Sequence, residues 1–317
     1  MWIQRAFSYI EILSHYISTK RPNCLWQSGV VLMAMALFLQ ACGPSPNATP
    51  TVLTGQLSVA ATIYPMQFLA ERIGGDRVQV RGLVPTGVGS HDWEPSPRDL
   101  RDVYDADVFI HTGDGFEGWV DRLLRDLESG GPLVISVALE VAEDGPHVWM
   151  DPGLYALQAG RVHDGLVLAD PAGTSVYAAN LSALQNELAT LEAEMERGLA
   201  TCDRNSLVVS HAAYSYLTQR FGLEQIAIAG VFPEVEPSPA KVRAVIEQIR
   251  STGATHVLYE TLASPRIAQT IAEEAGVELL PLNPLEGLTE EQASAGSDYF
   301  TMMRDNLATL RTALGCR

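Results

Sequence analysis

The stretch LSVAATIYPMQFLAERIGGDRVQVRGLV (residues 57–84) predicts a strand, a helix and a second strand in succession. Residues 57–63 form a compact apolar run that is typical of a buried strand. Residues 65–73 are expected to be helical, because Gly74-Gly75-Asp76 ends the apolar pattern, and residues 78–84 are the next strand. A helix between two such strands is the repeating unit of a parallel α/β sheet.

The same alternation continues towards the C-terminus. Further strands are expected at 107–111, 133–137, 206–210, 225–229, 255–259 and 277–282, with helices between them and a final helix or helix pair over 291–314. Leucines at three- and four-residue spacing predict one long helix over 173–199, with Asp170-Pro171 at its start. We therefore predict an α/β fold with two lobes, each a mostly parallel sheet with flanking helices, joined by a long rigid helix. The expected boundaries are 57–169 for the N-terminal lobe, 170–200 for the linking helix and 201–317 for the C-terminal lobe.

The first residues have the pattern of an export signal. Lys20 and Arg21 precede an apolar run over 30–39, which is shorter than the roughly 20 residues of a membrane span. Leu39-Gln40-Ala41-Cys42 resembles a bacterial lipobox, so residues 1–41 are expected to be a lipoprotein signal peptide and Cys42 a lipidated N-terminus. Residues 42–56 are polar and proline-rich, as in a flexible tether. We therefore expect a protein anchored on the outer side of the membrane, either in the periplasm or at the cell surface. A plain secretory signal or an uncleaved anchor is the alternative.

Composition narrows the function classes. The 317 residues are 47% hydrophobic and 19% charged, with a formal net charge of −17. Such an acidic chain is a poor partner for nucleic acid, whereas acidic surface concentrates cations. Export would place Cys202 and Cys316 in an oxidising compartment, which favours a disulfide between them, although two free thiols remain an alternative.

Three histidines have similar surroundings. His91, His147 and His211 each follow a loop or a predicted strand, with proline, glycine or aromatic residues beside them. Ligands of open α/β sheets bind at the carboxyl ends of strands, so two facing lobes could bring these loops together. Neutral imidazole is a preferred ligand of Zn²⁺, and the three residues therefore predict a metal site. His111, His163 and His256 are expected to be structural or surface residues.

Five sequence blocks resemble the metal-specific substrate-binding proteins of bacterial zinc and manganese ABC transporters. The resemblance runs from about Leu57 to the C-terminus. It rests on the segments 87–97 (GVGSHDWEPSP), 146–152 (PHVWMDP), Asp170-Pro171 with Tyr177 and Asn180, 208–214 (VVSHAAY) and 236–239 (EPSP). It implies one metal ion bound between two α/β lobes, with His91, His147 and His211 as its ligands.

The fourth ligand is harder to identify from the sequence. Many members of this family have an aspartate in a Leu-Asp-Pro-Leu motif, where this chain reads Leu282-Asn283-Pro284-Leu285-Glu286. A neutral amide oxygen is a weak zinc ligand, so the resemblance to the zinc-importing branch favours Glu286. Asn283, Glu260 and water remain alternatives. Three imidazoles with one carboxylate favour Zn²⁺ over Mn²⁺, because manganese sites usually have more oxygen ligands.

The leading hypothesis is a receptor outside the cytoplasm, not an enzyme. It would bind Zn²⁺ as cargo, deliver it to the permease of an ABC importer and act as a monomer. A manganese or iron receptor of the same family is the first alternative. A zinc hydrolase would need an open coordination position with Glu286 as a base. The chain has neither a His-Glu-x-x-His nor a Gly-x-Ser-x-Gly motif. Surface adhesion by the same fold is a third hypothesis.

Overall fold

The computed structural model describes residues 55–113, 115–127, 130–140, 144–231, 233 and 236–317. The predicted signal peptide, Cys42 and nearly all of the predicted tether lie outside these residues. Within the described ranges, no helix combines the length and the apolar character needed to cross a membrane.

The first sheet is built from the N-terminal half of the chain. Its strands are β1 (Leu57–Ala61), β2 (Val78–Gly82), β3 (Val108–His111) and β4 (Leu133–Ser136). They pair in the order β2-β1-β3-β4, and every pairing is parallel. All four residues of β3 are buried, as expected for a strand covered on both faces of a parallel sheet.

The second sheet repeats this topology. Its strands are β5 (Ser206–Val209), β6 (Glu224–Ala227), β7 (His256–Tyr259) and β8 (Glu278–Pro281). They are again all parallel, in the order β6-β5-β7-β8. The predicted α/β class with two parallel sheets is confirmed, and each of the eight strands overlaps its expected range.

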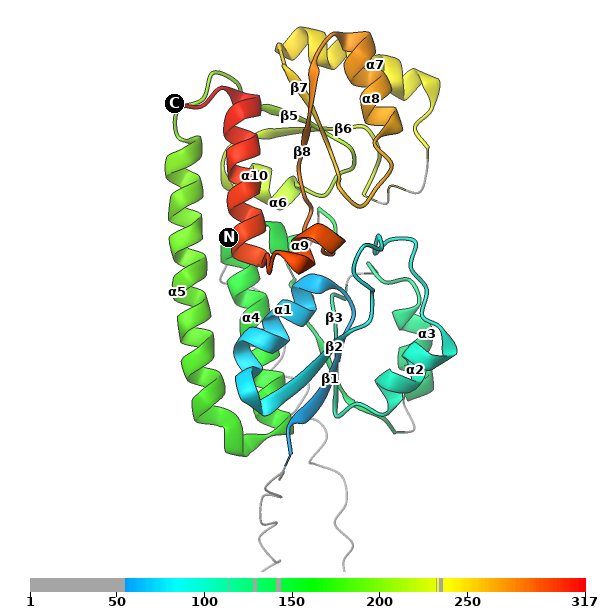
Figure 1. Ribbon diagram of the computed structural model, residues 1–317, viewed down its shortest axis with the longest axis vertical. Coiled ribbons are helices and arrows are strands. Elements are labelled where there is room, and N and C mark those ends of the chain that lie inside the picture. The colour runs from blue at the N-terminus through cyan, green and yellow to red at the C-terminus, as the bar shows by residue number, and fades with distance from the viewer. Residues whose placement is uncertain (1–54, 114, 128–129, 141–143, 232, 234–235) are drawn as a thin grey trace, which may run out of the picture. The chain divides into compact units, whose positions relative to one another are not determined.

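Helices cover these sheets (Figure 1). In the N-terminal half they are α1 (Tyr64–Gly74), α2 (Pro97–Tyr104) and α3 (Val120–Leu127); in the C-terminal half they are α6 (Ser215–Arg220), α7 (Pro239–Thr252), α8 (Arg266–Ala275), α9 (Glu290–Ser294) and α10 (Tyr299–Leu314). The last two are the helix pair that was one of the two expectations for 291–314. Short 3₁₀ turns lie at η1 (Gly75–Arg77), η2 (Val148–Met150) and η3 (Pro171–Gly173).

The expected single linking helix is one arm of a helical hairpin. An additional helix, α4 (Pro152–Ala169), leads through η3 into α5 (Thr174–Leu199), and the two helices pack against each other (Figure 1). The α4 N-terminus is capped by Asp151, whose carboxylate accepts hydrogen bonds from the backbone N–H groups of Gly153 and Leu154. Sequence patterning predicted only α5, because the glycines in α4 weaken both helix propensity and the apolar stripe.

A four-residue motif recurs at equivalent points of the two halves. Glu-Pro-Ser-Pro occurs at 94–97 and again at 236–239. Ser96 caps α2 by accepting from the Asp99 N–H, and Ser238 caps α7 by accepting from the Lys241 N–H. Each helix follows the second strand along the chain in its sheet. The two halves are therefore related in topology and in this local sequence.

One hydrophobic core runs through both halves. It includes Val59 of β1, Leu69 of α1, Leu188 of α5, Val209 of β5 and Leu310 of α10, all buried. Smaller clusters lie beneath α2 and α3 and beneath α7 and α8. A disulfide joins Cys202 to Cys316 and links the segment before β5 to the end of α10.

Candidate metal centre

The three predicted histidines and Glu286 come from four separate segments of the chain. His91 lies in the glycine-rich loop after β2, His147 directly precedes η2 as its N-cap residue, His211 lies two residues after β5, and Glu286 lies in the loop after β8. These segments meet where the carboxyl ends of the strands in both sheets converge. The topology therefore brings together residues that are far apart in sequence.

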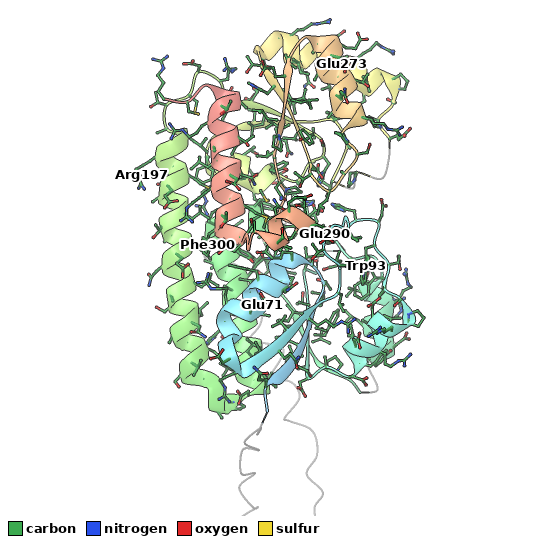
Figure 2. All side chains as sticks on the ribbon, viewed as in Figure 1. Glu71, Trp93, Arg197, Glu273, Glu290 and Phe300 are labelled. Atoms are coloured by element: carbon green, nitrogen blue, oxygen red, sulfur yellow. A yellow bond between two sulfur atoms is a disulfide. The ribbon has the colours of Figure 1, made fainter. Side chains whose placement is uncertain are left out.

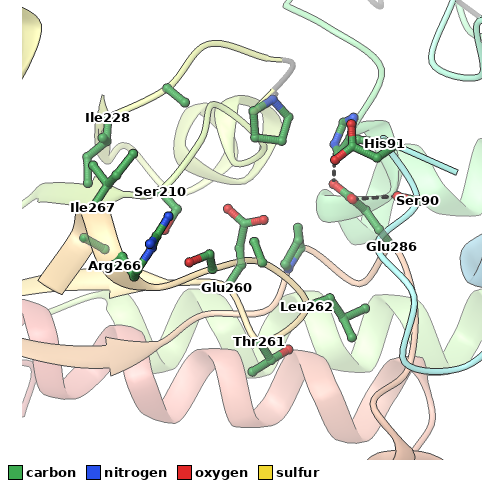
Figure 3. A pocket seen from close by; sticks show the side chains of 18 of the residues that line it. Ser90, His91, Ser210, Ile228, Glu260, Thr261, Leu262, Arg266, Ile267 and Glu286 are labelled. Atoms are coloured by element: carbon green, nitrogen blue, oxygen red, sulfur yellow. Dashed lines mark hydrogen bonds and ion pairs between the residues drawn. The ribbon is translucent and has the colours of Figure 1, made fainter. Parts of the chain in front are cut away.

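The four side chains share one small volume. Glu286 Oε1 lies 3.1 Å from His91 Nε2, 3.0 Å from His147 Nε2 and 3.4 Å from His211 Nε2. The two buried imidazoles of His147 and His211 approach to 3.3 Å between their Nε2 atoms. One candidate ligand atom from each of the four residues lies within 4.8 Å of the others. Figure 3 shows Glu286 directed at His91, with Ser90 beside it.

Burial and hydrogen bonding give these groups unequal proton affinities. Burial lowers the pKa of His147 to about 4, against the opposing effect of Glu286. Burial also acts to lower the pKa of His211, but hydrogen bonds to Glu260 and Glu286 outweigh it and raise that pKa to about 10. Burial acts to raise the pKa of Glu286, but the hydrogen bonds from the three imidazoles hold it well below the usual value. Glu286 is therefore an anion, and a cation that binds here would take the place of the His211 proton.

A strained turn presents Glu286 to the histidines. Leu285, the preceding residue, has φ 62°, and it is the one non-glycine residue with positive φ in the described part of the chain. Asn283 holds this turn: its Oδ1 accepts a 2.7 Å hydrogen bond from the Leu285 N–H, and its own N–H donates to Asn306 Oδ1 at 2.9 Å. Of the alternatives for the fourth ligand, Asn283 thus has its amide oxygen engaged in the turn and outside the cluster.

Glu260 contacts the cluster from behind. Its Oε1 lies 2.5 Å from Nδ1 of His211, the ring nitrogen opposite the one that faces Glu286. A carboxylate at Nδ1 fixes the imidazole tautomer that leaves the Nε2 lone pair free for a metal. From the sequence, Glu260 was an alternative fourth ligand or a helix cap, and its bond to His211 was not predicted. The missed signal was that Glu260 follows β7 and His211 follows β5, two neighbouring strands of the same sheet.

Aromatic rings enclose the site on another side. The ring of Phe116 lies 4.8 Å from the His91 ring and 5.6 Å from both the His147 ring and the Trp149 ring. Trp149 Nε1 donates a 2.8 Å hydrogen bond to the Pro284 carbonyl, which joins the His147 segment to the Glu286 loop. Trp93, labelled in Figure 2, packs on Trp119 instead, with ring centroids 5.7 Å apart. Of the two tryptophans that follow a histidine, only Trp149 packs against the cluster. The contact of Phe116 with the histidines was not predicted from the sequence.

A cavity adjoins the cluster. Its volume is about 380 Å³, and His91, Glu286 and Glu260 contribute to its lining (Figure 3). Glu236 lies at its margin, and Ile228, Leu262 and Ile267 form much of the apolar wall. Acidic side chains in such a recess attract cations. Three imidazole nitrogens and a carboxylate oxygen form a donor set suited to a four-coordinate Zn²⁺.

The remaining described histidines lie away from this cluster. His111 is buried and stacks on Phe109, with ring centroids 5.7 Å apart. His163 pairs with Asp164, and His256 lies 3.6 Å from Glu278. None of the three belongs to the group of candidate ligands among the described residues.

Comparison with known proteins places this chain in one family. Residues 59–313 match the family model "ZnuA: Zinc-uptake complex component A periplasmic". A zinc-binding protein AdcA from Streptococcus pyogenes serotype M3 is 32% identical over 312 residues, covering 89% of this chain and 61% of the relative. The high-affinity zinc uptake system protein ZnuA of Bacillus subtilis is 28% identical over 91% of this chain and 98% of its own length. The chain thus spans about three fifths of the length of the AdcA relative.

Solved structures agree with this match. The Zn(II)-bound ZnuA-like domain of Streptococcus pneumoniae AdcA is 32% identical, with a TM-score of 0.73, and the match covers 82% of this chain and 99% of that domain. The laminin-binding protein Lmb of Streptococcus agalactiae, described as bifunctional with adhesin and metal-transporting activity, is 30% identical with a TM-score of 0.73 over 81% of this chain and 99% of its own.

Proposed function

The chain belongs to the ZnuA family of zinc-uptake components, and we propose that it is a receptor that binds Zn²⁺ outside the cytoplasm and delivers it to an ABC importer. The observation that carries the proposal is the convergence of three imidazole Nε2 atoms on one carboxylate oxygen of Glu286. The relatives described as zinc-binding and zinc-uptake proteins support zinc as the cargo.

We infer that His91, His147, His211 and Glu286 are the four ligands. The proximity of Glu286 Oε1 to all three rings supports a ligand role over that of a base acting on a metal-bound water, which would require the carboxylate to stand back from the metal. A site with four protein ligands leaves no position for an activated water, so the arrangement favours binding and release over hydrolysis. Mn²⁺ would find too few oxygen donors here.

We further propose that Cys42 anchors the mature protein to the membrane as a lipoprotein, and that it works there as a monomer. The relative described as a zinc-binding lipoprotein, AdcA of Streptococcus pneumoniae, supports the anchor. A tether over 42–56 would let the receptor reach a permease from that anchor.

The decisive experiment measures metal content and competitive affinity of residues 43–317, in the wild type beside Glu286→Ala and Asn283→Ala. We expect one Zn²⁺ per wild-type chain, and a loss of affinity for Glu286→Ala of about 100-fold or more, because the only anionic ligand is gone. Asn283→Ala is the matched control: it loosens the turn and should lower stability by about 1–3 kcal/mol, with a smaller effect on affinity. Preferential binding of manganese or iron, or an unchanged affinity in Glu286→Ala, would contradict the proposal.

A further inference from the structure

Glu117 is a buried carboxylate whose partners are hydroxyl and backbone N–H groups. It accepts hydrogen bonds from the hydroxyls of Thr62 and Thr112, and its Oε1 accepts from the Thr112 N–H at 3.2 Å. All three residues are buried, with at most 7% of each exposed. Burial raises the pKa of Glu117 against the opposing effect of these donors. Removing a carboxyl from water without a cationic partner is costly, so such a group calls for an explanation.

The partners of Glu117 lie at the carboxyl ends of two central strands. Thr62 directly follows β1 and Thr112 directly follows β3, and these strands are neighbours in the first sheet. The backbone of Glu117 leads into α3, since its carbonyl accepts from the Val120 N–H at 3.0 Å. The carboxylate thus ties the chain between β3 and α3 to the carboxyl ends of two neighbouring strands.

The neighbour of Glu117 in sequence contacts the candidate ligands. Phe116 is 5% exposed, and its ring lies against those of His91, His147 and Trp149. The two adjacent residues have different tasks in the structure: Glu117 bonds to the strands and Phe116 packs on the histidines. A shift of Glu117 would therefore move the ring that confines His91.

The second sheet has the corresponding arrangement around Glu260. Glu260 follows β7 and bonds to His211, which follows β5; Glu117 follows β3 and bonds to Thr62, which follows β1. Because the two sheets share their strand order, each carboxylate bonds across the same pair of neighbouring strands in its own half, although Glu260 directly follows β7 and Glu117 lies six residues after β3. In the C-terminal half the carboxylate holds a candidate ligand directly. In the N-terminal half it holds a threonine, and the link to the cluster passes through Phe116.

We propose that Glu117 is a positioning residue of the metal site, which acts through Phe116. By binding Thr62 and Thr112 it fixes the ring that confines His91 and His147 to their ligating orientations and excludes water from their side of the cluster. This inference rests on the proposed zinc-binding function. It predicts that loss of Glu117 speeds the release of zinc even though no metal ligand is altered.

The experiment is a double-mutant cycle on zinc dissociation, followed with Zn²⁺-loaded protein and an excess of chelator. Glu117→Ala and Phe116→Ala should each accelerate release by about 10-fold to 100-fold, the range typical of residues that orient metal ligands. In the double variant the rate should equal that of Phe116→Ala alone, because Glu117 acts through that ring. The visible spectrum of the Co²⁺-loaded protein should change in the same way in both single variants.

Two further variants separate positioning from general destabilisation. Val103→Ala creates a cavity in the separate cluster beneath α2 and α3, so it should lower the thermal midpoint of the apoprotein and leave zinc release unchanged. Glu117→Gln keeps the side-chain shape and one acceptor, so it should accelerate zinc release less than Glu117→Ala does. This smaller acceleration should also disappear in the Phe116→Ala background. If Glu117→Ala does not fold, Glu117→Gln is the variant that tests the inference. The inference would be overturned if the wild type bound zinc tightly and both Glu117 variants released it at the wild-type rate. It would also be overturned if the effects of the Glu117 and Phe116→Ala substitutions on the release rate were fully additive. Failure of the wild type to bind zinc would instead overturn the proposed function.

Discussion

Glu260 and His211 are joined by a 2.5 Å hydrogen bond between Oε1 and Nδ1, on the side of the imidazole that faces away from Glu286. His211 is fully buried, so no water competes for Nδ1. The carboxylate therefore keeps the proton on Nδ1 when a metal ion takes the place of the proton on Nε2, the nitrogen that faces the other ligands.

Truncating Glu260 should weaken metal binding without removing a ligand. We expect Glu260→Ala to lower zinc affinity by about 10-fold to 100-fold, and Glu260→Gln to lower it less, because the glutamine oxygen can still accept from Nδ1. Competitive titration against a chromophoric chelator would measure both effects. Glu236→Gln is the control, since Glu236 is an exposed carboxylate that lines the same cavity. An equal effect of Glu236→Gln would mean that general charge, and not the bond to His211, is responsible.

The Cys202–Cys316 disulfide closes a segment of 114 residues that includes the whole second sheet. Loops of this length lose much conformational entropy in the unfolded chain when they are closed, so Cys316→Ser should lower the free energy of unfolding by about 2–5 kcal/mol. Urea unfolding of the variant and of the wild type would measure the difference. Reducing agent should destabilise the wild type by a similar amount and leave the variant unaffected. A wild-type midpoint that is insensitive to reductant would contradict this account.

The strands could be predicted from sequence because each is a short apolar run between turn signals. Their parallel pairing followed from the alternation with helices. The convergence of the three histidines could be anticipated in the same way, since each follows a loop or strand end. What could not be anticipated depends on tertiary contact. Glu286 was the favoured fourth ligand, but the left-handed turn at Leu285 that directs it at the cluster was not predicted, and Phe116 reaches the cluster from a segment with no metal-binding signature.

Helix α4 was not predicted because its packing against the sheet requires glycine, which is a poor helix former. A Cβ atom at Gly165 would lie 2.1 Å from Cδ1 of Ile135 in β4, so glycine permits close approach of helix and sheet. Helix propensity penalises the same residue by about 1 kcal/mol relative to alanine. The Asp151-Pro152 pair was a usable signal for its start, of the same kind that Asp170-Pro171 provided for the expected long helix.

Two glycines of α4 provide a matched test of this explanation. Gly165→Ala should destabilise the protein by about 1–3 kcal/mol, because Ile135 is buried and must move. Gly160→Ala should stabilise it by up to about 1 kcal/mol, because no atom lies within 4 Å of the added Cβ. Thermal and urea unfolding of the two apoprotein variants would give both signs. If both substitutions stabilised the protein, the close packing of α4 on β4 would be wrong.

His111 should make stability depend on pH independently of the metal site. Burial lowers its pKa from 6.5 to about 4, with a smaller opposing effect from Asp121. Above pH 6.5 the imidazole is neutral in both the folded and the unfolded chain, and it adds no pH dependence. Between 6.5 and about 4 the unfolded chain binds a proton that the folded chain does not, so stability is lost as the pH falls. The full loss, reached below the folded pKa, is about 3 kcal/mol.

Replacing His111 by glutamine removes this titration and keeps a neutral polar side chain on Phe109. The difference in unfolding free energy between wild type and His111→Gln, measured in urea at a series of pH values, isolates the contribution of this one histidine from those of His147 and His211. We expect that difference to be constant above pH 6.5 and to shift in favour of the variant as the pH falls towards 4. A difference that stays constant over the whole range would show that His111 is protonated as readily in the folded protein as in the unfolded chain, which a ring buried at the end of β3 should not allow.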